Sequence, residues 1–119
     1  MRARLLSQAV AFALAAALAF GQEPDFVRDV QPILAEHCYP CHGPDGKQRK
    51  ANLRLDDRAA VVARGVVVPG DAAHSPLVAR ITSADPKRMM PPPDSHRTLS
   101  DGERRAIERW IAAGARYET

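Results

Sequence analysis

Cysteine and aromatic residues are scarce in this 119-residue chain, which has 2 Cys, 1 Trp, 2 Tyr and 3 Phe. So few large apolar rings predict a thin core, and small domains with thin cores usually need a covalent or metal-based reinforcement. Cys38 and Cys41 are too close in the chain for a disulfide between them to add much stability, because the loop that it closes is very short. A covalently held cofactor would supply the missing core.

A strong charge of one sign is also absent. The chain has 17 basic and 14 acidic residues, and without Arg2 and Arg4 the basic residues fall to 15, a formal charge of +1. A protein that binds nucleic acid is expected to carry a clear excess of positive charge. The composition therefore argues against a nucleic-acid partner.

The long uncharged apolar run lies at the N-terminus. Arg2 and Arg4 precede it, and small residues close it near Gly21. This layout is typical of a secretory signal peptide, so we expect residues 1–21 to be a signal peptide and residues 22–119 to be one exported domain. An uncleaved membrane anchor is the alternative, and only then would the protein contact a membrane.

Strand-like patterns are missing as well, and the apolar spacing is helical. Residues 26–37 have one apolar stripe, and Pro32 inside it should kink or split the helix. Asp56 or Asp57 should cap a helix that stops at Gly65. We therefore expect an all-α domain with helices at both ends of the chain.

The final helix has the clearest signals. Ser100 and Glu103 form a capping box, Trp110 lies on its apolar face, and Gly114 is expected at its C-terminal cap. Before it runs a long irregular loop in which the prolines at 91–93 predict a polyproline-like strut. Further upstream, another helix should begin at Ser75 and Pro76, as N-cap and first helical residue.

The chemistry of the chain centres on C-x-x-C-H, which is Cys38, Cys41 and His42. This order is typical of a c-type haem attachment site. Two thiols add across the haem vinyl groups, and the imidazole of the next residue becomes the proximal iron ligand. We therefore expect one covalently attached haem c.

Three other interpretations of the motif stay open. A redox disulfide needs only C-x-x-C but usually occurs within a βαβ pattern, which is absent here. A zinc site needs a second ligand pair at comparable spacing, and His74 and His96 do not form one. A small structural module with a C-x-x-C disulfide is the third.

Methionine is the usual sixth ligand in electron-transfer cytochromes c. Met89 and Met90 are the candidates, since the adjacent prolines restrict the backbone and reduce the entropy lost in holding a weak thioether ligand. His96 or His74 would be a replacement, and methionine as an ordinary core filler is the alternative. His37 is adjacent to the motif, where an exposed position at a helix end is the commoner arrangement and contact with a haem propionate the alternative.

Three stretches resemble the planctomycete-type cytochrome c domain, a branch of the class I cytochrome c-like fold. They are "FVRDVQPILAEHCYPCHGPDGKQRKANLRLDDRAAVV", "VVPGDAAHSPLVARI" and "RMMPPPDSHRTLSDGERRAIERWIAAGA", which together cover nearly all of the expected exported domain. The resemblance implies thioethers at Cys38 and Cys41, iron ligation by His42 and Met90, and first and last helices that cross around the haem beside a Pro-rich ligand loop. It also implies that Phe26 and Trp110 lie near the contact of those helices.

The expected function is one-electron transfer in the bacterial periplasm by a mono-haem cytochrome c, either free-standing or as the electron-transfer part of a larger redox system. Such a protein is an electron carrier rather than an enzyme. Its partners are redox proteins, with no small-molecule substrate. A haem sensor or weak peroxidase is the alternative if the sixth ligand is easily displaced.

Overall fold

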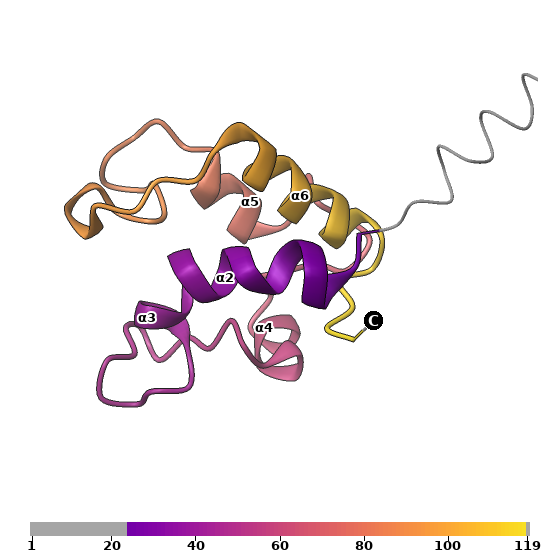
Figure 1. Cartoon of the computed structure of the whole chain (residues 1–119), viewed down its shortest axis with the longest axis horizontal. Coiled ribbons are helices and arrows are strands. Elements are labelled where there is room, and N and C mark those ends of the chain that lie inside the picture. The colour runs from indigo at the N-terminus through magenta and orange to yellow at the C-terminus, as the bar shows by residue number, and fades with distance from the viewer. Residues whose placement is uncertain (1–23, 119) are drawn as a thin grey trace, which may run out of the picture.

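The structure, a computed structural model, describes residues 24–118, and over that range it consists of helices, turns and loops without a strand. The predicted signal peptide, residues 1–21, lies outside the described residues. The helical elements are η1 (Phe26–Val30), α2 (Gln31–His37), α3 (Tyr39–His42), α4 (Arg58–Ala63), α5 (Pro76–Ile81), η2 (Pro93–Ser95) and α6 (Asp101–Ala112). The predicted all-α class is confirmed. Figure 1 shows α2 between α5 and α6 on one side and α3 and α4 on the other.

Pro32 divides the N-terminal helical stretch, as its position predicts. The first part, η1, is a π-helix, and the α-helix α2 begins at Gln31 with Pro32 in its first turn. A proline is tolerated there because the first backbone N–H groups of a helix have no partner within the helix. Both parts still share one buried side, to which Val30 and Leu34 belong. The last residue of α2 is His37, so this helix leads directly into the C-x-x-C-H segment.

The caps of α4 and α5 differ in kind. Asp57, rather than Asp56, caps α4, and its carboxylate accepts a hydrogen bond from the backbone of Ala60 at 3.2 Å. Ser75 is the N-cap residue of α5, as predicted, but its side chain makes no cap bond. The buried hydroxyl instead accepts from the Val68 backbone N–H at 2.8 Å, which fixes the turn before the helix.

The predicted capping box of α6 is present. The Ser100 hydroxyl accepts from the Glu103 backbone N–H at 3.1 Å, and the Glu103 carboxylate accepts from the Ser100 backbone N–H at 2.9 Å. Ile107, Trp110 and Ile111 are buried on the apolar face. The box therefore sets where α6 begins, and the apolar face sets how it lies on the core.

Aromatic rings join the two ends of the domain. Phe26 of η1 stacks on Trp110 of α6 with ring centroids 5.6 Å apart, and Tyr117 stacks on Phe26 at 4.6 Å. The polar atoms of these rings have partners, since the Tyr117 hydroxyl donates to the Leu55 carbonyl and Nε1 of Trp110 donates to the Arg116 carbonyl, both at 2.7 Å. A few large rings thus hold η1, α6 and the C-terminal segment together.

The Pro-rich loop is less regular than the sequence predicts. Pro92 has the φ of −68° and ψ of 154° expected of a polyproline conformation, but Pro93 already starts the short 3₁₀ helix η2. The predicted strut is therefore wrong beyond Pro92, because Asp94 and Ser95 can continue a turn that prolines alone would not form. Within residues 24–118, no helix has the length and apolar character needed to cross a membrane.

Candidate functional site

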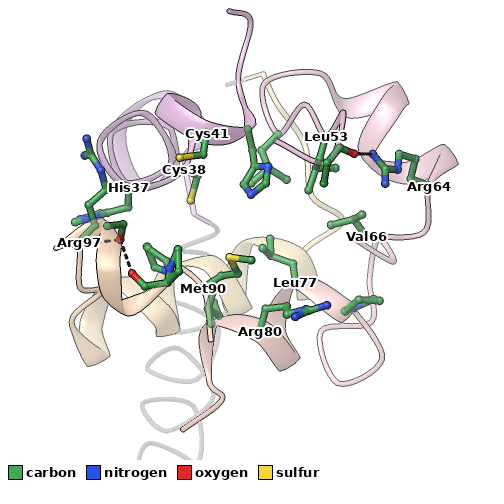
Figure 2. Close-up of a pocket in the computed structure, with 18 residues that line it drawn as sticks. His37, Cys38, Cys41, Leu53, Arg64, Val66, Leu77, Arg80, Met90 and Arg97 are labelled. Carbon is green, nitrogen blue, oxygen red and sulfur yellow. Dashed lines mark hydrogen bonds between the residues drawn. The ribbon is translucent and has the colours of Figure 1, made fainter. Parts of the chain in front are cut away.

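A cavity of about 290 Å³ lies beside the C-x-x-C-H segment. Cys38, Cys41 and His42 line it, and so does Met90, which comes from the Pro-rich loop far along the chain. Figure 2 shows the two cysteines on one wall and Met90 with Leu77 on the opposite wall. The fold therefore brings all four predicted site residues to one cavity.

The structure distinguishes between the two neighbouring methionines. Met90 lines the cavity and Met89 does not. The backbone N–H of Met90 donates to the Arg80 carbonyl at 3.1 Å, which joins the loop to the end of α5. His74 and His96, the other candidates for a sixth ligand, are not among the residues that line the cavity.

The His42 ring is oriented by a backbone carbonyl. Its Nδ1 lies 3.2 Å from the carbonyl oxygen of Lys50. Because a carbonyl oxygen can only accept, the hydrogen is on Nδ1 and the lone pair is on Nε2. Burial lowers the pKa of His42 below its ordinary value, which favours the neutral ring. A neutral imidazole with its tautomer fixed in this way is the form that binds iron.

The loop after the motif folds back onto it. The backbone N–H of Lys50 donates to the Cys41 carbonyl at 2.7 Å, and that of Leu55 donates to the His42 carbonyl at 2.8 Å. The guanidinium of Arg49 bonds to the next two carbonyls along the chain, at 2.9 and 3.1 Å. Four successive carbonyls of the motif segment are thus held by one loop, which fixes the backbone that carries the ligand.

Gly43 is required by a close approach that the sequence does not reveal. It is buried directly after His42, and a Cβ built on it would lie 2.3 Å from the backbone oxygen of Tyr39. That distance is far inside van der Waals contact, and the obstacle is backbone rather than a flexible side chain. The chain therefore needs glycine to leave the motif at this angle.

Both cysteines are free thiols in the structure. Cys38 is 8 % exposed, and burial raises its pKa to about 12. Cysteines that act in thiol–disulfide chemistry have lowered pKa values and positive surroundings. The environment of Cys38 therefore disfavours the redox-disulfide interpretation.

His37 does not have the exposed position that its place at a helix end suggests. Its side chain is only 11 % exposed, and its Nε2 donates to the Glu103 carboxylate of α6 at 3.2 Å. The other ring nitrogen, Nδ1, is buried without a hydrogen-bond partner among the described residues. The exposed arrangement was wrong because the covering helix comes 66 positions later in the chain.

The remaining lining of the cavity is apolar with cationic side chains at its edge. Leu53, Leu55, Val66 and Ile81 contribute carbon surface. Guanidinium groups come from a separate set of residues, namely Arg64, Arg80 and Arg97. An apolar interior suits a flat macrocycle, and a guanidinium at the cavity edge can pair with a carboxylate. The residues present therefore fit a haem: two thiols, a neutral imidazole, a thioether and an apolar enclosure.

An all-α domain in which C-x-x-C-H faces a methionine across an apolar cavity has the layout of a c-type cytochrome. The family model described as Planctomycete cytochrome C matches residues 38–94, a span that includes Cys38 and Met90. This match supports a planctomycete-type cytochrome c domain over residues 38–94, as the sequence resemblance predicted. No curated protein and no solved structure matches the chain.

Proposed function

We propose that this chain is a mono-haem cytochrome c that carries single electrons between redox proteins in a bacterial periplasm. The observation that supports this most directly is the cavity itself, which brings Cys38, Cys41, His42 and Met90 together from two distant parts of the chain. When bound, the haem iron supplies the one-electron couple. The protein contributes attachment, axial ligands and an apolar enclosure that together set the reduction potential.

Each of the four residues has a distinct role in this proposal. Cys38 and Cys41 would hold the porphyrin through thioethers, and His42 would bind the iron through Nε2, since the Lys50 carbonyl accepts from its Nδ1. Met90 would supply the second iron ligand through its thioether sulfur, and methionine paired with histidine raises the reduction potential. If His42 and Met90 both bind the iron, they would leave it no open position for oxygen, peroxide or another substrate. The protein is then an electron carrier rather than an enzyme.

The proposal extends to the fold. In the cytochrome c-like arrangement that we propose, the N- and C-terminal helices cross around the haem. The stacking of Phe26 on Trp110, with centroids 5.6 Å apart, marks where η1 and α6 meet. Residues 1–21 would direct export, and haem attachment would follow export. The partners would be redox proteins, with no role for nucleic acid or a small-molecule substrate.

The sixth ligand is tested by replacing Met90 with alanine. Ferric haem with methionine ligation has a weak red charge-transfer band, and we expect it in the wild-type protein and not in Met90→Ala. Met89→Ala is the matched control and should keep the band, because Met89 does not line the cavity. The measurement is a visible spectrum of each oxidised protein.

Two results would contradict this ligand assignment. If the wild-type protein lacks the band and binds cyanide or carbon monoxide readily, the sensor or peroxidase alternative is favoured. If Met89→Ala loses the band and Met90→Ala keeps it, the neighbouring methionine is the ligand. A colourless protein made together with haem-attachment machinery would favour the structural module with a disulfide.

A further inference from the structure

If the cavity holds a haem, as the proposed function requires, its two ends present different groups to the cofactor. Haem carries its two vinyl groups on adjacent pyrrole rings and its two propionates on the other two rings. Because Cys38 and Cys41 take the vinyl edge, the carboxylate edge must point to the opposite end of the cavity. The residues that bind the propionates are therefore expected away from the cysteines.

Arg64 lies at that opposite end. Figure 2 shows it across the cavity from Cys38, beside Leu53 and Val66. It is the C-cap residue of α4, and its side chain is exposed, which suits a group that meets a carboxylate at the cavity edge.

The guanidinium of Arg64 is already held in position. Its Nη1 donates to the carbonyl oxygens of Ala51 at 3.0 Å and Asn52 at 2.9 Å. Both of these residues have positive φ, 55° and 52°, so their carbonyls are turned by a tight loop. Nε and Nη2 of Arg64 make no hydrogen bond to any residue that the structure describes. Two donors of a planar fork thus remain for an incoming carboxylate.

Arg97 has the same charge but is at the wrong end. Figure 2 places it beside His37, on the side of the cysteines. Its Nη1 donates to the Glu36 carbonyl, which ties it to the end of α2. His37 lies at the same end of the cavity as Arg97, so its unpartnered Nδ1 is on the vinyl side and not on the carboxylate side. Both residues line the cavity, yet neither faces the expected position of a propionate.

We propose that Arg64 binds a haem propionate through its two remaining donors, while the carbonyls of Ala51 and Asn52 hold the guanidinium in place. A guanidinium fork matches the geometry of a carboxylate and binds it through parallel hydrogen bonds. One side chain would then connect the end of α4, the loop after the C-x-x-C-H motif and the cofactor. Arg80 also lines the cavity, but its Nη1 already donates to the Arg88 carbonyl at 3.3 Å, and Arg88 itself does not line the cavity.

Resonance Raman spectroscopy of the full holoprotein tests the proposal, since the propionate bending bands shift when a hydrogen bond to the carboxylate is lost. We expect Arg64→Gln to shift one of these bands. Arg97→Gln is the matched control, because it removes the same charge from the same cavity, and it should leave both bands at their wild-type frequencies. Arg64→Lys keeps the charge without the fork and should also shift the band.

The proposal is overturned if the bands in Arg64→Gln and Arg64→Lys are unchanged, or if Arg97→Gln shifts them by as much. Having two variants at position 64 keeps the test decisive when one of them fails to fold. Covalent haem content is measured on every sample by the alkaline pyridine assay. Absence of haem from the wild-type protein would refute the proposed function, whereas unshifted bands in a haem-containing protein would refute only the role of Arg64.

Discussion

Replacing Cys38 and Cys41 together with alanine is expected to abolish covalent haem attachment. Each thiol supplies one thioether, and no other cysteine exists in the chain to replace it. The double variant should lose all haem that survives denaturation, while either single variant retains one bond to the porphyrin. Haem staining of a denaturing gel and the alkaline pyridine assay measure this loss directly.

The control for this experiment is Met89→Ala, which changes a residue of similar chemistry outside the cavity. It should attach haem like the wild-type protein. Immunoblots of periplasmic fractions separate loss of attachment from loss of export. Covalent haem in the double variant would overturn the assignment of the motif, as would a wild-type protein that is exported with haem-attachment machinery and remains without haem.

Gly43→Ala is expected to destabilise the domain by about 2–4 kcal/mol. The added Cβ would lie 2.3 Å from the backbone oxygen of Tyr39, so the last turn of the motif or the start of the loop must move. Either movement disturbs His42, whose backbone and ring are both held by that loop. The free energy of unfolding is measured by urea titration, and the yield of haem-containing protein should fall with it.

Gly46→Ala is the matched control from the same loop. No atom lies within 4 Å of a Cβ built at this position, and its φ is not in the left-handed region. The change in unfolding free energy should stay within about 0.5 kcal/mol. Equal destabilisation by the two alanines would show that the loop tolerates neither, and that the contact with Tyr39 is not the cause.

Much of the fold could be predicted from signals that are local in the sequence. The capping box at Ser100 and Glu103 lies within one turn, so its outcome depends little on distant residues. Pro32 is equally local, because a proline restricts its own φ and removes its own donor. The motif at Cys38 and His42 is contiguous for a chemical reason, since attachment and ligation act on one porphyrin.

The features that sequence did not predict depend on contacts between distant segments. Spacing alone left Met89 and Met90 open, and only the family resemblance favoured Met90, because the course of the loop decides which of them lines the cavity. The residues next to Arg64 in the sequence do not indicate that it binds a ligand, because the carbonyls that hold it, those of Ala51 and Asn52, belong to another loop. Such contacts follow from the packing of the whole domain, which periodicity alone does not encode.

The carboxylate of Glu103 has a consequence for local opening of the domain. One oxygen accepts from the Ser100 backbone N–H at 2.9 Å and the other accepts from His37 at 3.2 Å. We therefore expect fraying of the first turn of α6 to weaken the hold on the helix end that precedes Cys38 as well. The bond to Ser100 lowers the pKa of Glu103, so the contact persists at neutral pH and is lost as the pH falls far enough to protonate the carboxylate. A single acidic side chain thus couples the end of the helix before the attachment segment to the start of α6.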